Sequence, residues 1–351
     1  MDEVTLTIDG RQVKTGRGRT VLQAALEAGV EIPHLCYHPR LAPTGSCRLC
    51  LVEVEGARAL AASCALPVAD GMVVHTNSER VRAARRLVLQ LLISDHPLDC
   101  LTCERAGSCD LQRYCYEYGV SETPFEGEKR RLPKMETPFF EYDPNKCILC
   151  GRCVQACHDV RGRGVIDFTR RGFATVVAPP LEMLHIDAGC VSCGECVQTC
   201  PVGALVETSR KGLGREWELQ KTRTVCPYCG VGCEIELHTR DNRIVRVTAP
   251  EDAVVNAGSL CVKGRFGFEF VHSEDRLTRP LVRRDGELRE STWSEALRLV
   301  AERLRAVVEE HGPDSVGFLA SAKCTNEENF LLQKFARVVV GTNNVDHCAR
   351  L

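Results

Sequence analysis

Regularly spaced cysteines are the residues of this chain whose chemistry is easiest to recognise. The chain has 351 residues, 22 of them cysteine, and one group follows the pattern C-x2-C-x3-C-x27-C. Its members are Cys226, Cys229, Cys233 and Cys261. Four thiolates, one of them from a distant loop, are the usual ligands of a cubane iron–sulfur cluster. A structural zinc ion is the alternative, because Cys-x2-Cys pairs also bind zinc.

Lys263 follows the last of these cysteines by two residues. It places a cation beside a centre that gains and loses negative charge, and its ammonium group can donate a hydrogen bond to the next electron carrier. Gly230 and Gly232 let the backbone pass close to a bulky inorganic core. This part of the chain is therefore expected to hold a redox-active cluster.

Two further groups of ligands lie nearer the N-terminus. The first has the spacing C-x10-C-x2-C-x13-C and consists of Cys36, Cys47, Cys50 and Cys64. The second combines one histidine with three cysteines: His96, Cys100, Cys103 and Cys109. A neutral imidazole makes a site less negative than a fourth thiolate would, which alters its reduction potential. Cys115 is left over, and we expect it to be a packing residue.

An internal repeat carries eight more cysteines. The pattern C-x2-C-x2-C-x3-C occurs twice, at Cys147, Cys150, Cys153 and Cys157 and again at Cys190, Cys193, Cys196 and Cys200. This is the signature of two-cluster ferredoxins, in which the fourth cysteine of each run binds the other cluster. One predicted set is therefore Cys147, Cys150, Cys153 and Cys200, and the other is Cys190, Cys193, Cys196 and Cys157.

Composition narrows the class of protein. The net charge is −2, so no nucleic-acid-binding surface is indicated. No apolar run reaches the roughly 18 residues of a membrane span, and the N-terminus has no signal-peptide pattern. A cytoplasmic location follows, and thiols stay reduced there. So many cysteines in a reducing compartment favour metal clusters over disulfides.

The elements around these ligands indicate an α+β protein of several small domains. Apolar alternation around Asp9-Gly10 predicts a hairpin, and Thr20 and Ser78 can each cap a helix. A second hairpin is expected around Asp241-Asn242, and Thr292 and Thr325 begin capping boxes. The sequence between Gly312 and the Thr325 helix predicts a short buried strand at 316–320.

The expected domains follow from these elements. They are a β-grasp [2Fe–2S] ferredoxin-like domain at 1–77, a one-His/three-Cys [4Fe–4S] segment at 78–120, a linker at 121–140, a two-cluster [4Fe–4S] ferredoxin domain at 141–208, a molybdopterin-oxidoreductase-type [4Fe–4S] domain at 219–275, and the beginning of an α/β domain at 276–351.

The ligand patterns before residue 120 resemble the large iron–sulfur subunit of respiratory complex I and its hydrogenase relatives. Residues 222–351 resemble the catalytic subunit of molybdenum- or tungsten-dependent formate dehydrogenases. The matching segments are Thr224–Cys233, Leu260–Gly264, Glu327–Phe330, Gln333–Val338 and Gly341–Arg350. The resemblance implies interconversion of formate and carbon dioxide at a metal held by two molybdopterin guanine dinucleotides. Lys263 would lie between the nearest cluster and a pterin, and Cys324, Thr325 and Asn326 would lie near the pterin.

In that family the metal-binding cysteine or selenocysteine directly follows a Cys-Ala-Arg-x segment. Here that segment ends at Leu351, so we expect the ligand at the next position and do not assign the role to Cys348. Our hypothesis is that an in-frame UGA codon follows. The 351-residue chain is then expected to be inactive by itself, although the resemblance implies that the full-length subunit is a formate dehydrogenase.

Other assignments remain open at this point. An NADH-quinone oxidoreductase or hydrogenase diaphorase subunit explains the sequence as far as Cys200, and nitrate reductases share the Cys226–Lys263 pattern. A stand-alone electron carrier is a third alternative. The resemblance implies a partner that contains flavin and iron–sulfur clusters, or a hydrogenase module. The choice of molybdenum or tungsten, the direction of catalysis and the oligomeric state are left open.

Overall fold

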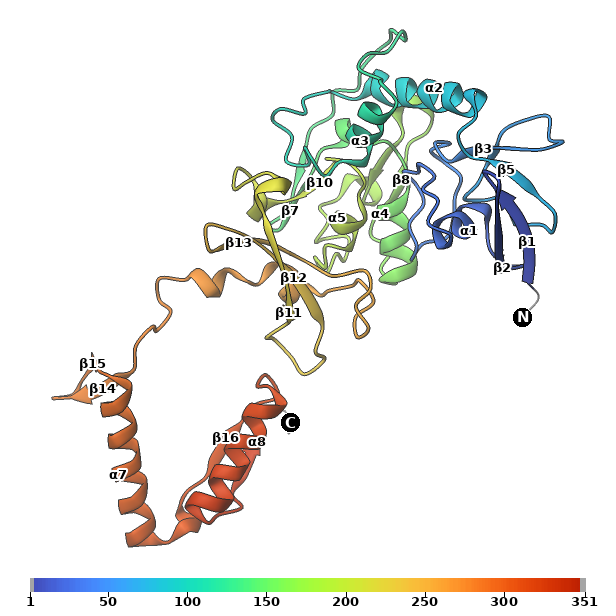
Figure 1. Ribbon diagram of the computed structural model, residues 1–351. Helices are drawn as coiled ribbons and strands as arrows, with labels where there is room; N and C mark the ends of the chain where they lie inside the picture. The colour runs from blue at the N-terminus through green and yellow to red at the C-terminus, as the bar shows by residue number, and fades with distance from the viewer. Residues whose placement is uncertain (1–2, 348–351) are drawn as a thin grey trace. The chain divides into compact units, whose positions relative to one another are not determined.

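The apolar alternation that begins at Val4 builds the first sheet of the computed structural model, which describes residues 3–347 (Figure 1). The sheet has five strands in the order β2-β1-β5-β3-β4. Its elements are β1 (Glu3–Ile8), β2 (Arg11–Gly16), α1 (Val21–Glu27), β3 (Leu51–Val54), β4 (Ala61–Ala62) and β5 (Val73–His75). Asp9 and Gly10 form the turn between β1 and β2 with positive φ angles of 48° and 80°. The predicted hairpin is confirmed.

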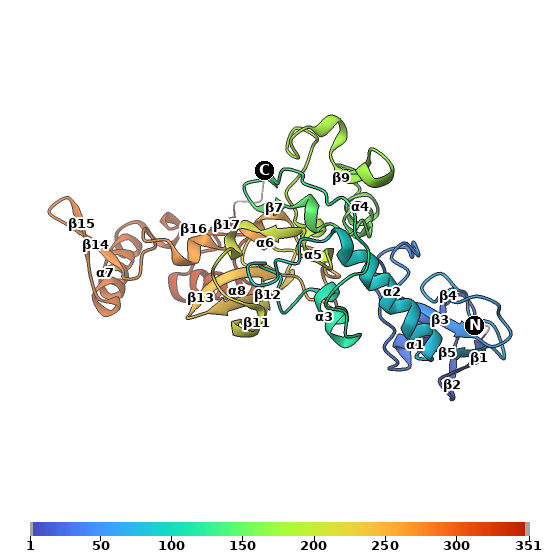
Figure 2. The same cartoon turned by 90° about the horizontal axis from the view of Figure 1, so that it is seen from above.

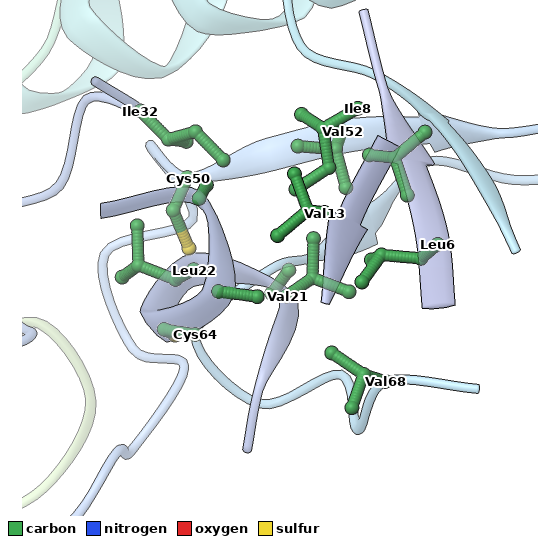
Figure 3. Packing of buried hydrophobic residues seen from close by; sticks show 14 of the residues in the cluster. Leu6, Ile8, Val13, Val21, Leu22, Ile32, Cys50, Val52, Cys64 and Val68 are labelled. Carbon is green, nitrogen blue, oxygen red and sulfur yellow. The ribbon is translucent and has the colours of Figure 1, made fainter. Parts of the chain in front are cut away.

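The core of this domain lies between α1 and the sheet (Figure 3). Leu6, Ile8 and Val52 come from the sheet, and Val21 and Leu22 come from α1. The side chains of Cys50 and Cys64 belong to the same buried cluster. The first set of predicted ligands is therefore continuous with the hydrophobic core that positions it.

The second segment consists of α2 (Glu79–Asp95) and α3 (Asp110–Glu117), which lie side by side in both views (Figure 1, Figure 2). Ser78 caps α2 as predicted, since its side chain accepts a hydrogen bond from the backbone N–H of Val81. The apolar residues of the sequence predict a buried face of this helix at positions 81, 84, 87, 88, 91 and 92, and this prediction is partly wrong. Leu87 and Leu91 are 48% and 51% exposed, and the buried positions are Val81, Arg85, Leu89 and Ile93.

Arg85 is buried because its guanidinium group donates hydrogen bonds to buried carbonyl groups, which an apolar side chain could not do. It donates to the carbonyl oxygens of Leu49 and Leu51, which flank Cys50, and to the Tyr118 hydroxyl at 2.7 Å. One guanidinium group thus ties α2 to the Cys50 loop and to the residue that ends α3.

The repeat region forms a small three-stranded sheet, in the order β10-β7-β6, with short helices and a β8–β9 hairpin. Its elements are β6 (Met135–Glu136), β7 (Phe140–Tyr142), α4 (Arg152–Gln155), a π-helical turn (Ala156–Val160), β8 (Asp167–Thr169), β9 (Val176–Ala178), α5 (Glu195–Thr199) and β10 (Leu205–Glu207). The expected linker at 121–140 is thus partly structured, because β6 and the first residue of β7 fall inside it.

A third sheet has the order β11-β12-β13, and the short helix α6 follows it. These elements are β11 (Gln220–Val225), β12 (Glu234–Arg240), β13 (Arg243–Thr248) and α6 (Val262–Phe266). Asp241 and Asn242 form the turn with φ angles of 49° and 59°. The hairpin predicted around Asp241-Asn242, which lies between Cys233 and Cys261 in the sequence, is confirmed.

The last described segment contains β14 (Leu281–Arg284), β15 (Glu287–Glu290), α7 (Trp293–His311), β16 (Phe318–Ala320), α8 (Asn326–Lys334), a π-helical turn (Phe335–Val340) and β17 (Val345–His347). Thr325 and Glu328 form the predicted capping box. Thr292 caps α7, but the carboxylate of Glu295 contacts Ser291 and Arg284 instead of completing a box. The strand expected to be buried is not, because Leu319 is 84% exposed.

Contacts divide the described chain into two units, 3–221 with 238–246 and 222–237 with 247–347. Small sheets and short helices in sequence confirm the predicted α+β multidomain class. Of the helices within residues 3–347, none has both the length and the apolar composition needed to cross a bilayer.

A buried charge network lies beside the β12–β13 hairpin in the first unit. Arg246 approaches the Nδ1 atom of His238 at 3.4 Å and Glu216 at 2.9 Å, and Glu216 also pairs with Arg210 at 3.3 Å. Burial, and then the nearby Arg246 cation, lower the pKa of His238 to about 3. The ring is therefore neutral in the folded protein at neutral pH.

Replacing Arg85 by alanine is expected to lower the free energy of unfolding of the N-terminal region by about 2–4 kcal/mol, because buried acceptors lose their donor. Urea denaturation followed by the visible absorbance of the cluster measures this change. Arg80→Ala is the matched control, since Arg80 is exposed and makes only surface contacts, an ion pair with Glu53 and a hydrogen bond to the carbonyl oxygen of Arg58. Equal midpoints for the two variants would contradict the role given to Arg85.

Below pH 6.5 the unfolded chain protonates His238 while the folded chain does not, so stability should fall as pH falls from 6.5 towards 3. The expected loss from this group is about 1.4 kcal/mol for each pH unit. His238→Gln should reduce the slope by nearly that amount between pH 5.5 and 4.5, where the unfolded chain is almost fully protonated at this position. Urea titrations followed by Trp217 fluorescence, in a Trp293→Phe background, measure the slope, and His311→Gln is the exposed control. An unchanged slope in His238→Gln argues against the assignment.

Candidate iron–sulfur centres

The first ligand set lies at the edge of the N-terminal core. Cys36, Cys47, Cys50 and Cys64 are all buried. The backbone N–H of Leu35 donates to the sulfur of Cys47 at 3.4 Å, and the N–H of Cys47 donates to the sulfur of Cys36 at 3.5 Å. Hydrogen bonding from Cys64 lowers the pKa of Cys50 to about 7. Hydrogen bonding among the same thiols lowers the pKa of Cys36 and raises the pKa values of Cys47 and Cys64. The structure thus brings the four thiols within hydrogen-bonding reach of one another.

The second set surrounds a cavity of about 420 Å³ between α2 and α3. His96, Cys100 and Cys109 line it. His96 is buried, and its Nε2 atom has no hydrogen-bond partner. A buried imidazole nitrogen that faces a cavity without a partner is suited to binding a metal. This observation fits the one-His/three-Cys cluster expected from the sequence.

Cys103, the remaining predicted ligand of this set, faces a different neighbour. A Cβ atom added to Gly203 would lie only 2.5 Å from its sulfur, so the thiol packs directly against the Gly203 backbone. Cys115, expected to be a packing residue, instead lines the cavity with His96, Cys100 and Cys109. The sequence reasoning missed this position, because Cys115 lies outside the recognised spacing.

The repeat places its eight cysteines in two crossed sets. One small hollow is lined by Cys147, Cys150, Cys153 and Cys200, and another by Cys157, Cys190, Cys193 and Cys196. Each set therefore takes three thiols from one run and one from the other. This grouping is the one that the two-cluster spacing predicts.

The two runs also share one backbone arrangement. Leu149 and Ser192 both have positive φ angles, 53° and 50°. Their N–H groups donate to the sulfurs of Cys147 and Cys190 at 3.4 and 3.3 Å. The left-handed conformation turns an amide towards the sulfur two residues earlier, where it can stabilise negative charge on a ligand.

Direct contacts join the second set to the repeat. The N–H of Asp110, next to Cys109, donates to the carbonyl oxygen of Pro201, next to Cys200, at 2.9 Å. Arg105 donates to the carbonyl oxygen of Cys200 at 3.0 Å. Lys146, adjacent to Cys147, pairs with Asp99 at 2.7 Å. The hydrogen bond between Asp110 and Pro201, with a few covalent bonds on either side, thus links Cys109 of the one-His/three-Cys set to Cys200 of the repeat.

A further ion pair joins the first domain to the repeat. Arg40 pairs with buried Glu195, the neighbour of Cys196, at 2.6 Å. Gln155 donates to the carbonyl oxygen of Ala42 at 3.0 Å. The loop that carries the first ligand set is therefore held against the second hollow of the repeat. Arg40, Arg105 and Lys146 have no local sequence signal, because their partners lie far along the chain.

The last set lies in the second unit. The N–H of Cys226 donates to the carbonyl oxygen of Cys233 at 2.8 Å. Burial, followed by the nearby thiols of Cys226, Cys229 and Cys261, raises the pKa of Cys233. Gly264 approaches the Cys226 sulfur, since an added Cβ would lie 3.4 Å from it. Lys263 is exposed, and its cation acts on the Cys226 thiol.

The predicted pterin loop lies beside a hollow in the same unit. Because β16 and β17 pair in parallel, the residues that follow both strands meet at one edge. A hollow of about 440 Å³ there is lined by Ser321, Asn329, Gln333, Asp346 and His347 among others. Cys324, Thr325 and Asn326 do not line it: Cys324 is exposed and Thr325 caps α8. Cys348 lies outside the described residues.

The spacing of the thiols bears on the zinc alternative. Among residues 3–347, no three histidine, cysteine or carboxylate side chains stand close enough to share one metal ion. Zinc needs four ligands within about 2.3 Å of one point. A cubane needs a wider arrangement, because each of its ligands binds a different iron atom. For the Cys226 group, the match of residues 219–273 to the molybdopterin oxidoreductase Fe4S4 domain favours a cluster over zinc.

Comparison with known domains gives five matches along the chain. Residues 1–79 match a 2Fe-2S iron-sulfur cluster binding domain, and 85–124 match the NADH-ubiquinone oxidoreductase-G iron-sulfur binding region. Residues 146–204 match a 4Fe-4S dicluster domain. Residues 219–273 match the molybdopterin oxidoreductase Fe4S4 domain, and 276–351 match molybdopterin oxidoreductase. The expected kinds of cofactor, [2Fe–2S], [4Fe–4S] and molybdopterin, are confirmed.

Several curated proteins are similar over 99% of the chain. The chain is 40% identical to the NADPH-Fe(3+) oxidoreductase alpha subunit of Geobacter sulfurreducens and to an NADH-quinone oxidoreductase G-type subunit of Rhizobium meliloti, spanning 40% of each. It is 33% identical to a Staphylococcus aureus protein provisionally named a formate dehydrogenase, spanning 39% of it. The chain thus spans about 40% of the length of these relatives.

A solved structure is similar as well. A chain from the crystal structure of the NAD+-reducing [NiFe]-hydrogenase in its H2-reduced state is 35% identical, with a TM-score of 0.57. The match covers 60% of the present chain and 90% of the hydrogenase chain.

Neutralising Arg105 is expected to lower the midpoint potentials of the clusters at the His96 and Cys200 sites. Loss of one nearby positive charge disfavours the added electron by about 1–2 kcal/mol at an effective dielectric constant near 20, or roughly 40–90 mV for one electron. Redox titration followed by electron paramagnetic resonance measures the shift in Arg105→Gln. Arg105→Lys keeps the charge and should stay near the wild-type potential. Unchanged potentials in Arg105→Gln would rule out an electrostatic role.

Proposed function

We propose that this chain is the electron-transferring part of a formate dehydrogenase catalytic subunit. The proposal starts from its family, because the chain belongs to the molybdopterin oxidoreductases that carry iron–sulfur domains like those of NADH-quinone oxidoreductases. Five clusters, one [2Fe–2S] and four [4Fe–4S], would store and pass single electrons between a molybdopterin site and a partner protein. The predicted ligand sets and domain limits are part of this proposal. So is a cytoplasmic location, which suits a chain of exposed and buried thiols.

The observation that carries the proposal is the direct connection between cluster sites. The Asp110 N–H to Pro201 carbonyl hydrogen bond joins the residues next to Cys109 and Cys200. The Arg40–Glu195 ion pair holds the [2Fe–2S] loop against the second hollow of the repeat. A protein that used these clusters only for stability would have no need to place them so close together. Short connections of this kind suit electron transfer.

The chain's own residues have three roles in this process. Cysteines and His96 bind the clusters, and amides such as those of Leu149 and Ser192 donate hydrogen bonds to sulfur. Arg105 and Lys146 supply positive charge between two sites. The domain cores keep water and oxidants away from the buried sulfurs, such as those of Cys50 and Cys153.

The assignment to formate rests on the second unit. Lys263 follows Cys261 at the start of α6, where the formate dehydrogenase family has its lysine between cluster and pterin. The hollow at the carboxyl edge of β16 and β17 offers polar groups from Ser321, Asn329 and His347. Ligands of open α/β sheets bind at such edges. These groups suit a molybdopterin with molybdenum or tungsten. The Staphylococcus aureus relative is also provisionally named a formate dehydrogenase.

A second candidate is an electron-transfer subunit of an NADH-quinone oxidoreductase or a hydrogenase. The similarity to the hydrogenase chain, which is 90% covered, favours it. Its partners would be subunits that contain flavin and iron–sulfur clusters, which the formate dehydrogenase proposal also requires at the N-terminal end. The two candidates differ in whether a pterin and formate are involved.

The native complex, purified without oxygen, is expected to reduce a viologen dye with formate and to release fluorescent pterin products on oxidation. It should not oxidise reduced viologen with nitrate. Lys263→Ala should lower formate-dependent dye reduction at least tenfold, about 1.4 kcal/mol in activation free energy, with unchanged iron. Lys211→Ala, a change to a lysine of the first unit, is the control. Dye reduction by hydrogen or NADH without pterin would instead support the second candidate.

A further inference from the structure

We propose that Cys115 is a fifth side chain able to bind a cluster at the His96 site, and that it can replace Cys103 as the ligand of one iron atom. The inference rests on the proposed iron–sulfur cluster at this site and is independent of the substrate. It gives a role to a cysteine that lies outside the recognised ligand spacing.

The position of Cys115 on α3 carries the first part of the argument. Leu111 and Gln112 precede it by four and three residues, so all three lie on one face of the helix. All three also line the cavity of about 420 Å³. A cavity of roughly 150 Å³ already takes up a molecule the size of benzene. Cys115 therefore faces a space large enough for an inorganic cluster.

The other donors of the cavity carry the second part. His96, Cys100 and Cys109 line the same space, and the buried Nε2 atom of His96 has no hydrogen-bond partner. With Cys115 these side chains make a complete set of four donors. A cubane requires four, one for each iron atom. The cavity can thus supply a full set of ligands without Cys103.

Cys103 is the ligand that Cys115 is best placed to replace. Its sulfur packs against Gly203, where an added Cβ would come within 2.5 Å. Its carbonyl oxygen is held by Arg215 at 2.6 Å. In the exchange the iron–sulfur bond to Cys103 breaks and one to Cys115 forms, and the proton lost by Cys115 is taken up by the released Cys103 thiolate, so the charge of the site is unchanged. The exchange needs no oxidant or reductant.

The test compares the iron content of the full chain in four forms. The wild-type chain should hold about 18 iron atoms, from one two-iron and four four-iron clusters. Cys115→Ala and Cys103→Ala should each keep that number. Cys103→Ala/Cys115→Ala should lose iron, between one atom and a whole cubane of about four. Cys200→Ala is the matched control and should lose iron as a single change, because no fifth cysteine of the described chain lines its hollow.

Anaerobic alkylation of the native protein gives an independent readout. Peptide mass spectrometry should find Cys115 labelled in the wild-type chain and protected in Cys103→Ala. Cys103→Ser repeats the measurement if the alanine variant folds poorly. Equal iron loss in Cys103→Ala and the double variant, or equal labelling of Cys115 in both proteins, would overturn the inference. A wild-type chain with no cluster at the His96 site would instead overturn the proposed function.

Discussion

Burial of thiolates is the physical constraint on which the rest of this structure depends. Burial raises the pKa of Cys150 to about 12 and of Cys109 to about 11, and it raises the pKa of Cys153 further still. Without a metal these sulfurs keep their protons and bind nothing. A metal cluster replaces those protons, so its binding free energy becomes folding free energy. Short strands and one-turn helices such as α4 and α5 depend on that contribution.

The surrounding groups offset the negative charge that the clusters bring. Each run of the repeat turns one left-handed residue, Leu149 or Ser192, so that its amide points at a sulfur. Arginine side chains hold the carbonyl groups nearby: Arg130 donates to the carbonyl oxygen of Cys147 at 3.0 Å, and Arg105 donates to that of Cys200. Because amides and cations both favour a reduced cluster, the polypeptide tunes potential through the same contacts that hold the fold together.

Most of each predicted ligand group could be recognised from sequence because the short spacings C-x2-C and C-x2-C-x2-C-x3-C are local. The distant fourth cysteine of the Cys226 group and the exchange of one cysteine between the two runs came from the known patterns of iron–sulfur proteins instead. The hairpins at Asp9-Gly10 and Asp241-Asn242 were local as well. Arg85 was not, since it is buried by carbonyl groups about 35 residues away in sequence that no periodicity reveals. The same reason hid the cavity position of Cys115. The prediction that the strand at 316–320 is buried was wrong for another reason. The side of the strand that carries Leu319 is not covered by any other part of residues 3–347.

The two sites of the repeat differ in their surroundings, although their loops are alike. Burial raises the pKa of Cys150 at the site that contains Cys200, and the nearby Arg152 cation opposes that rise. Burial acts in the same way on Cys147, where Arg130 opposes it. The other site has Glu195 next to Cys196, paired with Arg40, and Arg161 and Arg163 line its hollow. Cations therefore offset negative charge at both sites. The two sites differ in what they are joined to: the site that contains Cys200 is connected to the His96 cavity through Asp110 and Pro201, and the other site is connected to the loop that carries Arg40.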